Sequence, residues 1–242
     1  MLPKVSIVIP FYNCPYVDQA IQSAVNQTYP NVEVVVVSDG STQHLGRVKP
    51  YMDRIKFIEK PNGGTASAVN RGIVEATGDY FAWLSSDDRF YPHKVEHQLS
   101  YMMTHGARAC FTNYDRIDEK NQIFAHSASM LFRNITEFYT TFMSGDPING
   151  CTVMTDRSLI MELGYFNQGL ALTHDYDMWY RIILNGVDFH FLNETLTLHR
   201  THSRMREITR AGEVLHESAM IHGAYNARMA AYLHHLHQIG VY

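Results

Sequence analysis

The chain has 242 residues, of which 45% are hydrophobic, and a formal net charge of −4. This length and apolar content allow a sizeable buried core, which excludes an intrinsically disordered protein. The acidic balance argues against a general nucleic-acid binder, because neutralising phosphates requires clustered Lys and Arg.

Cysteine usage and hydropathy indicate the compartment. Cys14, Cys110 and Cys151 are widely spaced and odd in number. They predict a reducing environment without a disulfide framework, and we interpret them as small packing residues. The run from Met1 to Pro10 is too short for a signal peptide, and no window approaches the roughly 18 apolar residues of a membrane span. We expect a cytoplasmic protein, with peripheral contact at the inner face of the membrane as an open alternative.

The first part of the chain alternates predicted strands and helices. Residues 5–9 are β-branched and almost all apolar, which predicts a buried strand that Pro10 ends. Further strands are predicted at 32–37, 55–58 and 80–84, and helices at 17–25, from Asn62-Gly63-Gly64 to a C-cap at Gly78, and at 93–105. This alternation predicts an α/β fold with a parallel, doubly wound sheet.

Past Thr112 the pattern is less regular. We predict a strand at 151–154, helices at 156–163 and 175–184, an extended segment at 189–198 and a helix at 212–237. We expect one domain over 1–242, with a nucleotide-binding half at about 1–110, an acceptor half at about 111–205 and a C-terminal helical segment at about 206–242.

Polar residues follow four predicted strands, at 10–13, 38–40, 60–63 and 86–88. Ligands of such sheets bind beyond the carboxyl ends of the strands, so these residues should share one rim. Asp87 and Asp88 are adjacent carboxylates that repel each other, and a divalent cation such as Mg²⁺ or Mn²⁺ would explain them. The alternative is an Asx turn with a helix N-cap before Pro92, and the shared rim favours the metal.

These motifs, in this order, resemble the inverting glycosyltransferases of family 2, which have the GT-A fold. The resemblance covers roughly residues 4–204 and rests on 5–13, 35–42, 62–64 with Asn70 and Gly72, 78–80, 85–88, Pro92, 175–179 and 200–202. It implies a mostly parallel sheet flanked by helices. It also implies transfer of a sugar, with inversion, from a nucleotide-sugar donor such as a UDP-sugar to a saccharide or lipid-linked saccharide acceptor.

The resemblance implies a nucleotide site. Asp39 would accept a hydrogen bond from a pyrimidine N3–H, with a plain Asp-Gly turn as the alternative. Pro10 and Tyr12 would line the nucleoside. The rest of the predicted nucleotide-binding set is Lys60, Asn62, Gly63 and Ser86. For Lys60 the alternative is a solvated surface charge, and for the Asn62-Gly63 turn it is an ordinary loop before a helix.

The resemblance also implies a metal and a base. Asp87 matches the last position of the family's Asp-x-Asp motif, and the Mn²⁺ or Mg²⁺ that it holds would bridge the diphosphate. Asp88 would contribute indirectly, and His202 is the candidate to complete the metal shell. Asp175 matches the catalytic base, which would take the proton of the acceptor hydroxyl.

Two positions depart from the family pattern. Ser85 stands where an Asp is common, which lowers the charge of the metal site, and His174 replaces the usual Glu beside Asp175. These departures motivate a nucleotide-sugar-binding module without turnover as one alternative. A nucleotidyltransferase is the other, although it would need a Gly-rich, basic loop at residues 10–13.

Two further residues near the predicted base have plainer interpretations. Asp177 points away from Asp175 on a helix and is predicted to be structural. Trp179 would line the sugar site or belong to the core.

Overall fold

The computed structural model describes residues 2–203 and 205–240. Its first half follows the predicted alternation closely. The elements are β1 (Val5–Phe11), α1 (Val17–Val25), β2 (Val32–Asp39), α2 (Leu45–Val48), η1 (Lys49–Tyr51), β3 (Lys56–Lys60), α3 (Thr65–Glu75), β4 (Tyr80–Trp83), β5 (Arg89–Phe90) and α4 (Lys94–His105).

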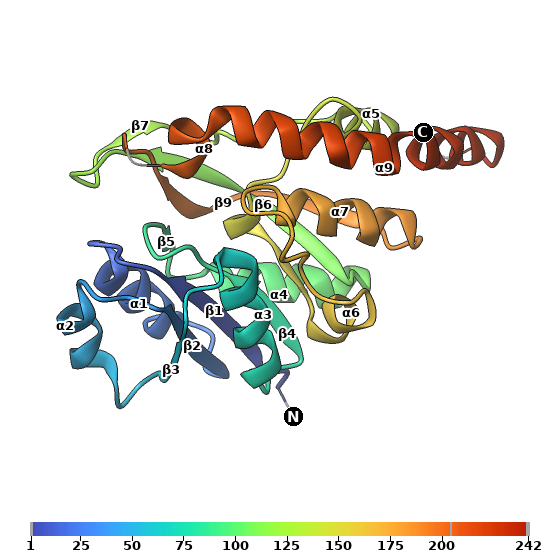
Figure 1. Cartoon of the computed structure of the whole chain (residues 1–242). Helices are drawn as coiled ribbons and strands as arrows, with labels where there is room; N and C mark the ends of the chain where they lie inside the picture. Colours follow the sequence, from blue (N-terminus) through green and yellow to red (C-terminus); the bar gives the residue numbers. More distant parts are fainter. Residues whose placement is uncertain (1, 204, 241–242) are drawn as a thin grey trace.

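The second half contains the elements that the sequence pattern predicted less well. They are β6 (Ala109–Ile117), β7 (Ile123–Ala125), α5 (Ile135–Phe142), η2 (Gly150–Thr152), β8 (Met154–Asp156), α6 (Arg157–Glu162), α7 (His174–Leu184), β9 (Phe189–Arg200), α8 (Arg206–Thr209) and α9 (Ala211–Gln238). The helix α9 lies across α7 and α5, on the opposite side of the molecule from the N-terminus (Figure 1).

One mixed sheet runs through both halves in the order β3-β2-β1-β4-β8-β6-β9-β5, with β7 paired to β6. The strands β3, β2, β1 and β4 are mutually parallel, and β6 is parallel to β9. The short β8 is antiparallel to both β4 and β6 and therefore joins the two parallel parts. The fold is thus α/β with a mostly parallel sheet flanked by helices.

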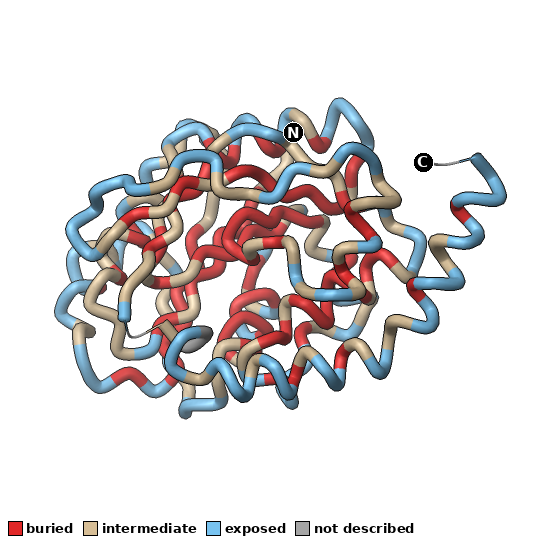
Figure 2. The backbone as a smooth tube through the Cα atoms, turned by 90° about the horizontal axis from the view of Figure 1, so that it is seen from above, coloured by how far each residue is buried: buried red, intermediate tan, exposed pale blue. Residues whose placement is uncertain are grey.

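Two hydrophobic clusters cover the two faces of the sheet. Along β1, Val5, Ile7 and Ile9 pack with α1 and α4, whereas Val8 packs on the other face with α3 and α7. This is the alternation of side chains expected of a strand that is buried on both faces. Figure 2 shows the buried segments at the centre of the molecule and the end of α9 projecting beyond them.

Three predicted boundaries were wrong for local reasons. Pro10 does not end β1, because β4 has already ended opposite Val8 and no ladder bond is lost on that side. Gly78 is not a C-cap: α3 ends at Glu75, and a Cβ at Gly78 would lie 2.4 Å from the Ser6 hydroxyl. The strand predicted at 151–154 begins only at Met154, since the Asn149 side chain caps a 3₁₀ turn over 150–152.

Candidate active site

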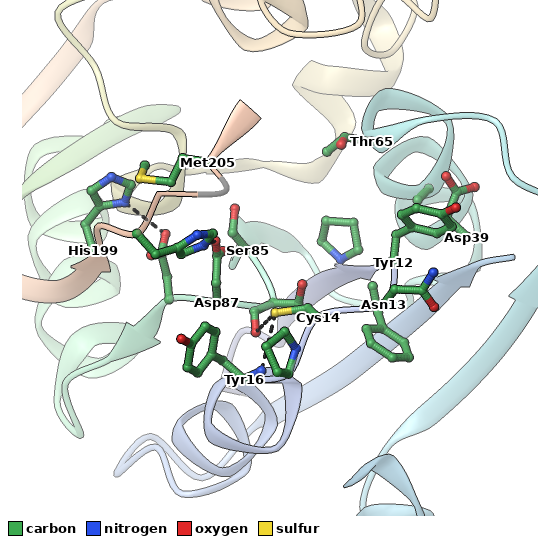
Figure 3. Close-up of a pocket in the computed structure, with 17 residues that line it drawn as sticks. Tyr12, Asn13, Cys14, Tyr16, Asp39, Thr65, Ser85, Asp87, His199 and Met205 are labelled. Atoms are coloured by element: carbon green, nitrogen blue, oxygen red, sulfur yellow. Dashed lines mark hydrogen bonds and ion pairs between the residues drawn. The ribbon is translucent and has the colours of Figure 1, made fainter. Parts of the chain in front are cut away.

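The carboxyl ends of β1, β2 and β4 surround a cavity of about 330 Å³. Asp39 and Tyr12 lie at one end of it, and Asp87 and His199 lie at the other (Figure 3). The lining residues that the sequence predicted are Pro10, Tyr12, Asp39, Ser86, Asp87, Asp88 and His202. The predicted convergence of strand ends is therefore present.

Asp39 organises the loop that leads into α3. Its carboxylate accepts hydrogen bonds from Lys60 Nζ at 2.6 Å and from the backbone N–H groups of Gly63 and Gly64 at 2.9 and 2.8 Å. The Asn62 side chain donates to the Asp39 carbonyl at 2.9 Å. Lys60, Asn62 and Gly63 thus surround Asp39 without lining the cavity themselves. Of about four acceptor positions on a carboxylate, one remains on Asp39 Oδ2.

The backbone conformation after Asp39 requires the glycine that stands there, Gly40. Its φ of +74° is unfavourable for other residues, and a Cβ there would lie 2.9 Å from the Asn62 backbone nitrogen. The Asp-Gly turn that we weighed as an alternative is therefore real. It also brings the loop of residues 62–64 against the end of β2.

At the other end of the cavity, Asp87 Oδ2 lies 3.1 Å from His202 Nε2. The adjacent Asp88 is only 2% exposed and faces β9 instead. Its carboxylate accepts from the Arg200 N–H at 2.7 Å and lies 3.2 Å from His199 Nδ1. Burial raises the pKa of Asp88, but His199 and the Arg200 N–H outweigh burial and hold that pKa below its ordinary value.

Two protein side chains, Asp87 and His202, are available here to bind a metal. In the chain as far as the structure describes it, no group of three or more His, Cys, Asp or Glu side chains could hold a metal ion. The Asp87–His202 pair offers one carboxylate and one imidazole, and both Asp88 oxygens already accept or face other groups. Such a pair suits a cation that shares its shell with substrate oxygens, not a metal enclosed by protein.

Arg200 holds the Asp87 loop and was not identified as a functional residue from the sequence. Its guanidinium is fully buried and donates to the carbonyls of Asp87 and Asp118, each at 2.8 Å. It also donates to the side chains of Gln19 and Asn121 at 2.9 and 2.7 Å. A planar fork of N–H donors suits such a junction, because it can bind several segments at fixed angles.

Cys151 packs as a buried residue, as predicted, but it also touches the site. Its sulfur accepts from the Ser85 N–H at 3.2 Å and donates to the Ser85 hydroxyl at 3.1 Å. Burial raises the pKa of this thiol, so it stays protonated and can donate. The Cys151 thiol thus holds Ser85, the residue that departs from the Asp-x-Asp pattern, in place.

A second cavity, of about 680 Å³, adjoins the first and shares Thr65, Ser85, Asp88 and His199 with it. Asp175 lines this second cavity from the first turn of α7, and Asp146 lines it from the loop after α5. Burial raises the pKa of Asp175, although the neighbouring His174 opposes this effect. Withdrawal from bulk water and the charge of Asp175 raise the pKa of Asp146 well above its ordinary value.

Gly150 packs tightly between Trp83 and Asp175. A Cβ at Gly150 would lie 3.0 Å from the Trp83 ring and 3.3 Å from Asp175 Oδ2. His174, where the family has Glu, packs its ring against Trp83 with a centroid separation of 5.3 Å. Its buried, aromatic surroundings suit an imidazole better than a carboxylate.

Asp177 and Trp179 are structural. Asp177 pairs with Arg181 at 2.7 Å and accepts from the Tyr225 hydroxyl at 2.8 Å. Trp179 is fully buried in the core and does not line either cavity. The prediction for Asp177 is confirmed, and of the two options for Trp179 the core is right.

The comparisons with known proteins bear on this geometry. The sequence profile described as "Glycosyl transferase family 2" matches residues 6–163. The chain belongs to this family. It is 36% identical to an uncharacterised glycosyltransferase of Rickettsia typhi, over 83% of this chain and 64% of the relative. It is also 38% identical to an uncharacterised glycosyltransferase of Rickettsia felis, over 83% of this chain and 35% of the relative.

A chondroitin synthase of Pasteurella multocida is 32% identical over 75% of this chain and 19% of its own length. Among solved structures, S. aureus TarS 1–349 in complex with UDP-GlcNAc superposes with a TM-score of 0.70 at 19% identity, covering 95% of this chain and 73% of that one. This match shows that the family 2 chain has the GT-A fold of TarS. The chain spans between about a third and two thirds of the length of its two Rickettsia relatives. Within residues 2–203 and 205–240, no helix is both long and apolar enough to cross a bilayer.

Proposed function

We propose that this family 2 domain transfers a sugar from a UDP-sugar to a hydroxyl of a saccharide or lipid-linked saccharide, with inversion at the anomeric carbon. The observation that carries the proposal is the junction of the two cavities. They meet at Ser85 and Asp88, with Asp87 on one side and Asp175 on the other. A donor whose diphosphate lies by Asp87 would therefore present its sugar to the cavity that contains Asp175.

In the donor cavity, Asp39 offers its remaining acceptor position to the N3–H of uracil. Tyr12 is 47% exposed and lines the cavity beside Asp39, where a nucleobase or ribose can pack against its ring. The Lys60 ammonium orients the Asp39 carboxylate through their 2.6 Å contact. A carboxylate fixed in this way accepts from uracil and thymine but not from cytosine, which has no N3–H.

Asp87 and His202 would hold a Mn²⁺ or Mg²⁺ ion together with the donor diphosphate. When bound, such an ion neutralises the charge that builds on the departing diphosphate. Arg200 fixes the Asp87 backbone and thereby orients its carboxylate toward the cavity. Family 2 enzymes generally use a divalent metal, and the Asp87–His202 distance of 3.1 Å is short enough for both groups to reach one ion.

Asp175 is the proposed base, which would remove the proton of the attacking hydroxyl. In an inverting displacement the acceptor oxygen bonds to the anomeric carbon as the bond to the diphosphate breaks, and the base takes the hydroxyl proton. Burial raises the pKa of Asp175, which makes it a stronger base than an exposed carboxylate. Names such as chondroitin synthase among the relatives support a saccharide acceptor.

The proposal is tested by UDP release and product analysis with UDP-GlcNAc, UDP-Glc, UDP-Gal and dTDP-Glc, with and without Mn²⁺, over a panel of saccharide acceptors. The anomeric configuration of the product is read by NMR. We expect metal-dependent transfer with inversion, and a loss of about 10³-fold in Asp175→Asn, because an amide cannot take the proton. Transfer that survives in Asp175→Asn would exclude it as the base. Tight UDP binding without turnover of any donor would instead favour a binding module.

A further inference from the structure

One carboxylate outside the proposed chemistry is bound by an unusual set of donors. Glu217 on α9 is only 9% exposed and accepts hydrogen bonds from the backbone N–H groups of Ala171, Leu172 and Thr173, at 2.8, 3.0 and 3.0 Å. The Thr173 hydroxyl donates a fourth hydrogen bond at 2.8 Å. Three successive amides that point at one carboxylate form a concave anion site made of backbone.

The segment that Glu217 binds leads directly to Asp175. Thr173 is the N-cap residue of α7, and its side chain makes no capping bond to the helix but donates to Glu217. The direction in which α7 starts is therefore set from outside, by α9. Ala171, Leu172 and Thr173 also line the cavity that contains Asp175.

Other hydrogen bonds between α9 and α7 lie further along both helices. His222 Nε2 lies 2.9 Å from the Tyr176 hydroxyl, Asn226 accepts from the Tyr180 hydroxyl at 2.7 Å, and the Tyr225 hydroxyl donates to Asp177 at 2.8 Å. These contacts hold the body of α7, whereas Glu217 binds the loop before it. A loss of Glu217 should thus release residues 171–175 without detaching the helix.

The charge of Glu217 also acts on Asp175. Hydrogen bonds from the three amides and Thr173 outweigh burial and lower the pKa of Glu217, so it is ionised at neutral pH. Burial is the largest effect on the pKa of Asp175 and raises it, whereas His174 lowers that pKa. The negative charge of Glu217 raises it further. The other titratable groups around this cavity are Asp146, His222, Asp88, His199, Cys151 and Tyr176.

We propose that Glu217 is a positioning residue for Asp175: by binding the amides of residues 171–173 it holds the start of α7 where the carboxylate meets the acceptor hydroxyl. The C-terminal helix is then part of the active site as well as a layer of the fold. This inference rests on the proposed function, in which Asp175 is the base.

The test compares Glu217→Gln with Glu213→Gln, a control one turn earlier on α9 whose exposed carboxylate pairs with Arg210. In Glu217→Gln an amide NH₂ faces backbone N–H donors, so the loop should open. We expect kcat to fall about 10- to 100-fold, since a displacement near 1 Å costs about that much. The KM for the donor and the Kd for UDP should stay unchanged. The acid limb of the kcat–pH profile should move to lower pH, because a negative charge beside Asp175 is lost.

Amide hydrogen exchange gives a readout that does not depend on turnover. Exchange at residues 171–175 should accelerate in Glu217→Gln and stay as in the wild type in Glu213→Gln. If Glu217→Gln does not fold, Thr173→Val removes one of the four bonds and should shift kcat and exchange in the same direction by less.

A folded Glu217→Gln protein with wild-type kcat, pH profile and exchange would overturn the inference, as would an equal loss of UDP affinity. Asp175→Asn distinguishes a failure of the proposed base from a failure of the proposed role of Glu217. If that variant retains full transfer, the proposed base is wrong. If it is inactive while Glu217→Gln is fully active, only the role of Glu217 is wrong.

Discussion

The donor cavity and the Asp175 cavity are assembled in different ways. In the donor cavity, Asp39 ends β2 and Asp87 follows β4, and the sheet brings them together because both strands pair with β1. In our proposal, Asp175 instead depends on the carboxylate of Glu217, which lies 46 positions after Ala171 in the loop that Glu217 binds. The proposed donor site is therefore brought together mainly by the order of the strands, with Arg200 fixing the Asp87 loop. The proposed base depends on side-chain hydrogen bonds between distant elements, so changes at the two sites should have different kinetic signatures.

The largest effect that would test this division is expected at Asp87. Replacing it with Asn removes a negative ligand but keeps its size, so Mn²⁺ should bind more weakly and transfer should fall by about 10²-fold or more. Transfer is measured against Mn²⁺ concentration, with Asp53→Asn, an exposed carboxylate, as the control. A Mn²⁺ dependence identical to the wild type would remove Asp87 from the metal site.

A smaller effect is expected for Asp39→Asn. Loss of a charge-assisted hydrogen bond to uracil should raise the Kd for UDP about 10- to 100-fold. The difference between the affinities for UDP and CDP should therefore become smaller. Calorimetry measures both nucleotides, and Glu59→Gln, an exposed acid on the neighbouring strand β3, is the control. The position of the acid limb in the kcat–pH profile should not move. If it does move, the two halves are coupled and the division fails.

The acceptor half is tested by Asp146→Asn. Asp146 and Asp175 repel each other, so neutralising one makes the other easier to ionise. The acid limb of kcat should move to lower pH, with the Kd for UDP unchanged. Asn keeps the acceptor oxygen that binds the Ile148 N–H at 2.9 Å, so the loop should persist. Ser144→Ala, an uncharged change in the same cavity, is the control, and an unmoved acid limb would contradict the prediction.

The smallest effect is expected at Lys94 and concerns the stability of the fold. Lys94 on α4 is fully buried beside Gln98, which donates to the carbonyls of Cys110 and Thr152 at 2.8 and 3.0 Å. Burial lowers the pKa of Lys94 to about 7, and the Cys110 and Cys151 thiols only partly oppose it. Between pH 7 and the ordinary pKa of lysine, the unfolded chain binds a proton that the folded protein does not. Stability should therefore rise with pH, by up to about 1.4 kcal/mol per unit.

Lys94→Met should remove this slope. Urea unfolding at pH 7.0, 7.75 and 8.5 measures it, with Lys120→Met, an exposed lysine, as the control. Equal slopes in the wild type and Lys94→Met would mean that the lysine is not neutral in the folded protein. The donor and acceptor readouts of the preceding variants should be unaffected by this change.

Sequence patterns predicted the donor half well because its signals are local. Apolar runs, helical periodicity and the turn residues after each strand identified β1 to β4 and the rim that carries Asp39 and Asp87. The strand β6 was missed because its buried residues include Thr112, Asn113 and Asp115, which interrupt any apolar run. Asp175 was found only through the resemblance to family 2. Glu217 and Arg200 were missed because their partners lie 44 to 181 positions away, beyond the reach of any local pattern.

The buried guanidinium of Arg200 has a consequence for synthesis of the chain. It bonds to Gln19, 181 positions earlier, and to the Asp87 carbonyl, so neither contact exists until β9 has left the ribosome. Domains are made from the N-terminus onward, and contacts of such separation form late. The strands around Asp39 can therefore pair while the Asp87 loop is still unsupported. Glu217 emerges later still, so in a nascent chain the proposed nucleotide pocket forms before the proposed base, Asp175, is held in position.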